Sequence, residues 1–73
     1  MSEKLLKIIN SIKKNKQDNP VESLTEEMRL REDLNLDSFD LAELTVKIED
    51  EFDIDIFEEG LVLTVGEILN KLP

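Results

Sequence analysis

The apolar positions of this chain follow a helical period in three separate stretches. In the first, near the N-terminus, apolar residues recur at intervals of three and four and therefore share one face of a helix. They are Leu5, Ile8, Ile9 and Ile12. Ser2 can cap this helix, and Asn15 and Pro20 mark its end. We therefore expect a first helix that begins after Ser2 and closes between Asn15 and Pro20.

The second stretch, residues 37–52, carries two apolar stripes. The stripe assigned to the core consists of Leu41, Leu44, Ile48 and Phe52. The second stripe is turned away from the first and consists of Phe39, Ala42 and Val46, with Glu43, Glu49 and Asp50 beside it. Two interpretations are open. The second stripe either packs on the first helix or the loop, or it forms a docking face whose carboxylates steer a basic partner.

The third stretch predicts a helix at the C-terminal end. Thr64 and Glu67 have capping-box spacing, and the apolar face consists of Val65, Ile68, Leu69 and Leu72. Residues 17–36 keep no helical period, so we expect a long loop whose apolar residues anchor it to the core. Residues 53–60 fit either a turn or a short helix. Without an alternating strand pattern, the chain is predicted to be an all-α bundle.

Composition restricts the function. The 73 residues suffice for one domain, expected to span residues 1–73, but not for a deep catalytic cleft. The chain has no Cys and no His, which excludes disulfides, thiolate metal sites and the commonest general base. Charges interrupt the N-terminal apolar residues, unlike in a signal peptide or membrane span. We expect a cytoplasmic protein that is not an enzyme.

Charge is divided unevenly along the chain. The net charge is −9, with +2 on residues 1–31 and −11 on residues 32–73. Phosphate backbones would repel the acidic part, which argues against nucleic acid as a partner. Basic protein surfaces would be attracted to it. The simpler interpretation, that the acids only keep the protein in solution, stays open on charge alone.

Ser38, directly after Asp37 at the start of the second helix, is the candidate for covalent chemistry. A side chain in the first turn is exposed, and the free N–H groups and helix dipole favour a phosphate attached there. A plain cap formed by Asp37 or Ser38 is the simpler alternative. A nucleophilic serine needs a base, yet there is no His, and Lys47 lies about 13 Å along the helix. Ser38 is therefore better suited to be modified than to catalyse.

A calcium site is weakly suggested by the acids before this helix. Asp33, Asn35 and Asp37 copy the opening of an EF-hand loop, but Ser38 replaces the Gly at its sixth position. Leu44 replaces the bidentate Glu at the twelfth position. We therefore predict no EF-hand and no specific metal site, and only loose divalent-cation binding by crowded carboxylates.

The run from Leu30 to Leu44, continued by residues 48–52, resembles the acyl carrier protein family. It reads LREDLNLDSFDLAEL and then IEDEF, against a family pattern of roughly L-x-x-D-L-G-x-D-S-L-D-x-V-E-L and L-E-E-E-F. The resemblance implies a four-helix bundle with a short third helix. It also implies a 4′-phosphopantetheine arm on Ser38, attached from coenzyme A by a separate Mg²⁺-dependent transferase, that carries acyl groups as thioesters.

The resemblance further implies a partner face on the second helix for the phosphopantetheinyl transferase and for acyl-transferring synthases. Carried over by position, the contact residues are Asp37, Phe39, Ala42, Glu43, Val46, Glu49 and Asp50. They coincide with the second apolar stripe and its acidic rim. We expect the carrier to be a monomer.

A few positions depart from the family pattern. Asn35 stands where Gly is usual, although Asn also tolerates a left-handed backbone. Phe39 replaces Leu, Lys47 occupies a small apolar position, and Phe57 stands where Pro is common. Fatty acid, polyketide and related lipid biosynthesis all stay open, as does an aminoacyl carrier. The alternative from another class is an acidic helical interaction module without a prosthetic group.

Overall fold

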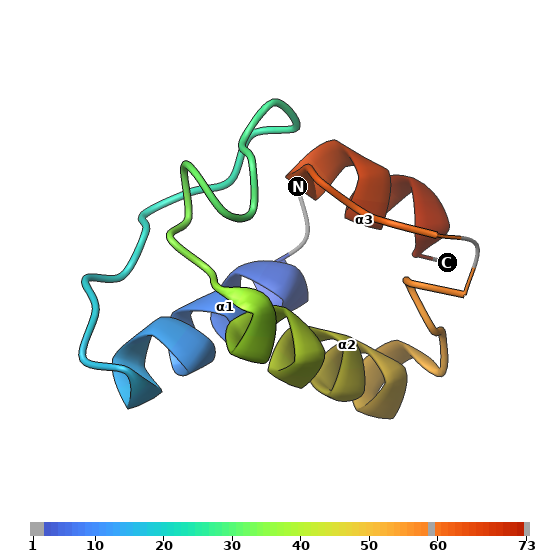
Figure 1. Ribbon diagram of the computed structural model, residues 1–73, viewed down its shortest axis with the longest axis horizontal. Coiled ribbons are helices and arrows are strands. Elements are labelled where there is room, and N and C mark those ends of the chain that lie inside the picture. Colours follow the sequence, from blue (N-terminus) through green and yellow to red (C-terminus); the bar gives the residue numbers. More distant parts are fainter. Residues whose placement is uncertain (1–2, 59, 73) are drawn as a thin grey trace.

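Three helices form the regular structure of the computed structural model, which describes residues 3–58 and 60–72 (Figure 1). Helix α1 spans Glu3–Asn15, α2 spans Ser38–Phe52 and α3 spans Val65–Lys71. The β-structure found over these residues is one isolated bridge between Arg29 and Thr64. The all-α prediction is therefore confirmed, and so is the long loop between the first two helices. Ser2, the predicted cap of α1, lies outside the described residues.

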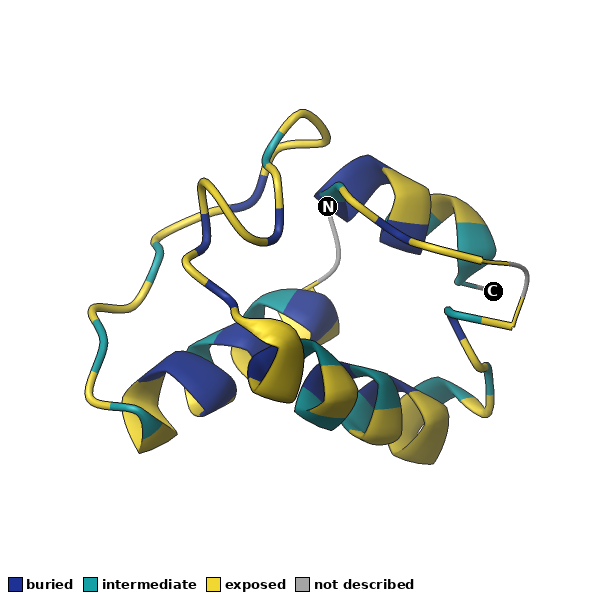
Figure 2. Ribbon diagram, viewed as in Figure 1, coloured by how far each residue is buried: buried dark blue, intermediate teal, exposed yellow. Residues whose placement is uncertain are grey.

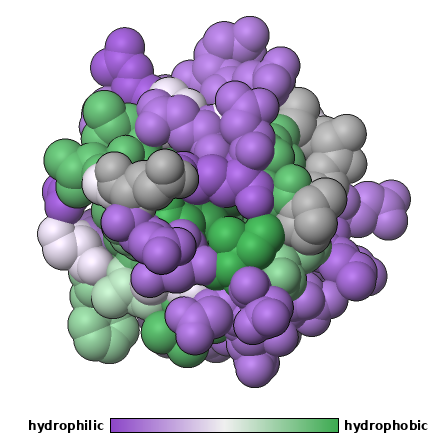
Figure 3. Space-filling view, turned by 90° about the vertical axis from the view of Figure 1, so that its right-hand side faces the viewer, coloured by the Kyte–Doolittle hydropathy of each residue, from purple (hydrophilic) through white to green (hydrophobic). Residues whose placement is uncertain are grey.

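The core is aliphatic and is enclosed by all three helices and the long loop. Helices α1 and α2 pack against each other, and α3 lies opposite them across the core (Figure 1). Buried positions face inward on every helix (Figure 2). The buried apolar residues are Leu5, Ile9, Ile12, Leu24, Leu30, Leu34, Leu36, Leu44, Ile48, Ile56, Val62, Val65 and Ile68. On the side of the molecule where α2 ends, some apolar surface stays visible between hydrophilic side chains (Figure 3).

The predicted core stripe of α2 does face this interior. Leu44 and Ile48 are fully buried, while Leu41 and Phe52 are partly buried against the same cluster. The apolar residues of the loop anchor it as expected. None of the described helices has the length and apolar character needed to cross a membrane.

Backbone hydrogen bonds attach the long loop to the beginning of α3. Val65 N donates to Met28 O at 2.9 Å, and Gly66 N donates to Glu26 O at 3.0 Å. The approach at Gly66 is close, because an added Cβ would lie 3.1 Å from both the Cβ and the carbonyl oxygen of Glu26. The loop is therefore a fixed part of the fold that closes the core opposite α1 and α2.

The expected short third helix is absent from the described residues, which hold three helices rather than four. Helix α2 ends at Phe52, and the backbone of its C-cap, Asp53, is left-handed with φ 59°. Single turns follow, with hydrogen bonds from Glu58 N to Asp55 O at 3.3 Å and from Gly60 N to Phe57 O at 3.2 Å. The Asp55 carboxylate also accepts from Phe57 N at 3.0 Å. Such a side-chain bond offers the backbone an alternative to helix, so the turn interpretation was the correct one here.

Candidate functional site: the exposed serine at the start of α2

Asp37 caps α2, so the neighbouring hydroxyl of Ser38 is not used as the cap. Asp37 Oδ1 accepts from Asp40 N at 2.8 Å, and Asp40 Oδ2 accepts from Asp37 N at 3.0 Å. This reciprocal pair is a capping box. Ser38 is the first residue of the helix and is exposed. The predicted exposure of Ser38 is confirmed. Of the two residues considered as the N-cap of α2, Asp37 is the one that caps the helix.

The hydroxyl of Ser38 accepts a hydrogen bond of 2.5 Å from Nη2 of Arg31. Arg31 lies in the long loop directly after Leu30, whose buried side chain fixes this part of the loop against the core. A guanidinium only donates and cannot take up a proton. Over the described residues, the partner of this serine is therefore not a general base. Sequence analysis missed Arg31, because no periodicity predicts a contact across seven residues of irregular loop.

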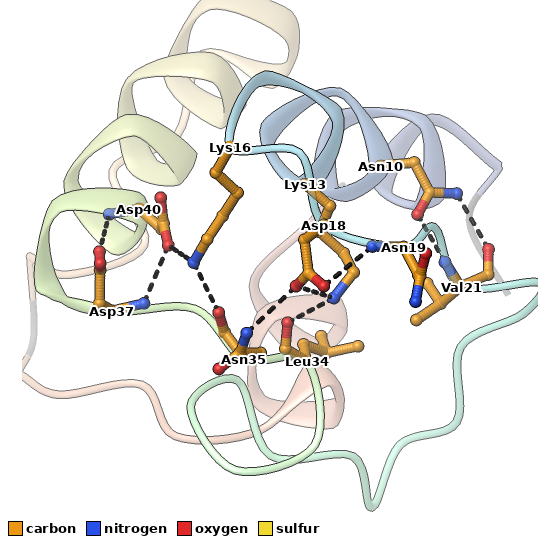
Figure 4. A network of polar contacts seen from close by, with 10 residues as sticks. All are labelled: Asn10, Lys13, Lys16, Asp18, Asn19, Val21, Leu34, Asn35, Asp37 and Asp40. Carbon is orange, nitrogen blue, oxygen red and sulfur yellow. Dashed lines mark hydrogen bonds and ion pairs between the residues drawn. The ribbon is translucent and has the colours of Figure 1, made fainter.

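An ion pair between Lys16 and Asp40 attaches the start of α2 to the residues that directly follow α1 (Figure 4). Lys16 Nζ donates to Asp40 Oδ2 at 2.5 Å and to Asn35 O at 2.8 Å. Burial by itself would raise the pKa of Asp40, but hydrogen bonds from Lys16 and from the Asp37 backbone outweigh it and lower that pKa. The hydrogen bond to Asp40 in turn raises the pKa of Lys16. Both groups are therefore charged at neutral pH.

A second part of the same network holds the loop immediately before the serine (Figure 4). The buried Lys13 donates through Nζ to Leu34 O at 2.7 Å and to Asp18 Oδ2 at 3.0 Å. Asn35 Nδ2 also donates to Asp18 at 3.2 Å. These hydrogen bonds, first from Lys13 and then from Asn35, hold the pKa of Asp18 at about 2. Asn35 has φ 57°, a left-handed backbone that Asn tolerates in place of the usual Gly.

The three residues that resemble the opening of an EF-hand loop, Asp33, Asn35 and Asp37, each form hydrogen bonds within the chain. Asp33 Oδ2 accepts from Arg29 N at 2.7 Å, Asn35 contacts Asp18, and Asp37 caps the helix. Their side chains therefore serve different partners. Residues 3–58 and 60–72 contain no group of three or more Asp, Glu, His or Cys side chains placed to hold a metal ion.

The second apolar stripe of α2 faces outward. Phe39 is 79% exposed and Val46 is 65% exposed, and Ala42 is also exposed. The interpretation that this stripe packs on α1 or the loop is therefore wrong. Exposure leaves the stripe available to a partner, and its role as a docking face stays a prediction.

The acidic rim of this stripe is only partly free. Glu49 and Asp50 are exposed, while Glu43 is half-buried with an oxygen 3.8 Å from Nζ of Lys47. Lys47 thus offsets one of the carboxylates. The negative potential of the face is therefore concentrated toward the end of α2.

A mainly apolar groove of about 550 Å³ adjoins the serine site. Arg31 contributes to its lining, so this residue contacts Ser38 and also borders the groove. Leu61 and Leu63, which line the groove, are 84% and 58% exposed. The apolar lining residues are Leu30, Leu41, Phe57, Leu61, Val62 and Leu63.

Comparison with known proteins gives two findings for the chain. The family model described as a phosphopantetheine attachment site matches residues 3–71. An acyl carrier protein of Saccharopolyspora erythraea is 44% identical over 52 residues, which cover 68% of this chain and 55% of that protein. The chain therefore spans about half the length of this curated relative. No solved structure matches the chain significantly.

Proposed function

The chain belongs to the acyl carrier protein family, whose prosthetic group is 4′-phosphopantetheine, and on this premise we propose that Ser38 bears the arm. The exposure of its hydroxyl at the first residue of α2 is the observation that carries the proposal. Asp37 already caps the helix, so modification of Ser38 costs no capping hydrogen bond. The Arg31 guanidinium at 2.5 Å from the Ser38 oxygen also suits a phosphate there.

For the attachment step, this chain would supply only the hydroxyl oxygen of Ser38. The Ser38 oxygen would bond to the phosphorus of the pantetheine-bearing phosphate of coenzyme A, while the pyrophosphate bond breaks and 3′,5′-ADP leaves. The hydroxyl proton would go to a base of the transferase, because Ser38 has no basic partner among the described residues. When bound, the arm supplies a terminal thiol that carries acyl groups as thioesters.

The chain would act as a carrier and not as an enzyme. Its cargo would be an acyl group of fatty acid, polyketide or related lipid biosynthesis, with an aminoacyl group as the alternative. The partner residues would lie on the outward stripe of α2 and its acidic rim. We expect a monomeric single domain that works in the cytoplasm.

The proposal is tested by incubating the protein with coenzyme A, Mg²⁺ and a promiscuous phosphopantetheinyl transferase and measuring intact mass. The wild-type chain should gain the mass of one arm, and Ser38→Ala should gain none. Ser11→Ala and Ser23→Ala, which remove other exposed serines, should be modified like the wild type. A wild-type chain that stays unmodified, or a Ser38→Ala chain that gains the arm, would contradict the proposal.

A further inference from the structure

Arg31 is a cation without an acidic partner over residues 3–58 and 60–72, in a chain with 18 carboxylates. Its hydrogen-bond partner in this part of the chain is the neutral hydroxyl of Ser38. Arg29, two residues earlier, instead pairs with Glu32 at 3.3 Å. The positive charge of Arg31 is therefore left without a counter-ion at the one hydroxyl proposed to receive a phosphate.

We propose that Arg31 is a positioning residue whose guanidinium pairs with the phosphodiester of the arm once Ser38 is modified. This inference rests on the proposed attachment at Ser38. The anionic oxygens of the diester are bonded to the phosphorus that Ser38 Oγ would carry, and Nη2 of Arg31 already lies 2.5 Å from that Oγ. Arginine binds phosphate through parallel N–H···O bonds, which are about twice as strong as bonds between neutral groups.

The pairing would also give the arm a direction. Arg31 borders the apolar groove, and so does Leu41 on the adjacent side of α2. A diester held by Arg31 would therefore lie beside this groove. The outward stripe of Phe39 and Val46 would then stay free for a partner.

Phosphorus NMR of the loaded protein tests this role. We compare wild type, Arg31→Gln and the matched control Arg29→Gln, which removes the same charge from the same loop. Each is loaded by the transferase and checked by intact mass. At low ionic strength, the diester resonances of wild type and Arg29→Gln should coincide. That of Arg31→Gln should shift toward the resonance of an unstructured peptide bearing the same modified serine.

Salt provides a second measurement on the wild-type protein. At about 1 M salt the Debye length falls to about 3 Å, so an exposed ion pair should weaken. The wild-type diester resonance should then move in the same direction as that of Arg31→Gln at low salt. The Arg31 Nε–Hε signal should also differ between the unloaded and loaded wild type, and that of Arg29 should not.

The two proposals fail in different ways. If wild type gains no arm, the attachment at Ser38 is wrong. If all three proteins are loaded but share one diester resonance, the role of Arg31 is overturned while the attachment stands. If Arg31→Gln cannot be loaded, the test depends on the wild-type protein alone. An Arg31 Nε–Hε signal that is the same before and after loading would then overturn the role of Arg31.

Discussion

At the scale of single residues, the site depends on Lys13, in the last turn of α1, and on Lys16, directly after that helix. Both lysines neutralise acids around the start of α2. Lys16 pairs with Asp40 of the capping box, and Lys13 pairs with Asp18 beside the turn at Asn35. Each pair replaces mutual repulsion of carboxylates by hydrogen bonds in a strongly acidic chain. The backbone before Ser38 is therefore held by charge pairs as well as by the apolar core.

The Asp18 pair predicts a defined acid sensitivity. The pKa of Asp18 is about 2 in the folded chain, against an ordinary value of 3.8. A depressed pKa means that the pair stabilises the fold fully above the unfolded pKa, and that this contribution is lost as the pH falls toward the folded pKa. The difference in unfolding free energy between wild type and Asp18→Asn should be constant above about pH 5 and shrink between about pH 4 and pH 2. Urea unfolding at several pH values measures it.

The two-protein comparison removes effects common to both chains, such as protonation of the exposed glutamates. A difference that stays constant down to pH 2 would show that Asp18 is not specifically stabilised in the folded state. A difference that grows with acid would contradict the lowered pKa outright.

The sequence indicated the candidate serine and its neighbouring cap, but not the residues farther along the chain that contact them. A start-of-helix serine or cap can be recognised from neighbouring residues, which is why Ser38 and Asp37 were found. The contact of Arg31 with Ser38 and that of Lys16 with Asp40 span seven and 24 positions of sequence through an irregular loop. No local pattern encodes such distances, because the path of the loop depends on how its leucines pack.

At the scale of the element, α2 has one apolar face that packs in the core and one that is exposed to solvent. The periodicity alone separated the two stripes, and the structure places the stripe of Ile48 inside and the stripe of Val46 outside. The same reasoning was insufficient for the segment after α2. There the Asp55 carboxylate accepts a hydrogen bond from the backbone N–H of Phe57, which favours a turn over a helix. The spacing of apolar residues does not predict a hydrogen bond of this kind.

Truncation of one residue on each face of α2 tests this assignment. Ile48→Ala should lower the unfolding free energy by about 2–5 kcal/mol, because it leaves a cavity in the core. Val46→Ala should change it by less than about 0.5 kcal/mol, because its side chain is exposed. In the transferase reaction, Val46→Ala and Phe39→Ala should instead slow loading of the arm. Similar stability losses for Ile48→Ala and Val46→Ala in urea unfolding would refute the two-faced description.

At the scale of the whole molecule, the distribution of charge distinguishes the two ends of α2. At the start of α2 Lys16 pairs with Asp40, whereas Glu49 and Asp50 stay exposed at the far end of the helix. An acidic surface of this kind accelerates encounter with basic surfaces, most strongly at low salt. We therefore expect the negative electrostatic potential at the end of α2 to attract a basic partner surface.

Charge reversal at this end should slow loading of the arm. The double variant Glu49→Lys, Asp50→Lys should reduce the initial transfer rate about tenfold at low salt, and less at high salt. Its matched control, Glu22→Lys with Glu27→Lys, makes the same change in net charge on the long loop. Intact-mass time courses at two salt concentrations measure both. Equal slowing by the two variants would mean that total charge, and not this surface, determines the rate.

The close approach of Gly66 to Glu26 has a consequence for how sequences with this architecture can diverge. One of the two nearest atoms is a carbonyl oxygen, so no choice of residue at position 26 could clear room for a larger one at position 66. Any side chain beyond hydrogen there would have to displace the main chain by a few tenths of an ångström. A chain of this architecture that carries a larger residue at position 66 should therefore show the main chain at position 26 displaced by about that amount.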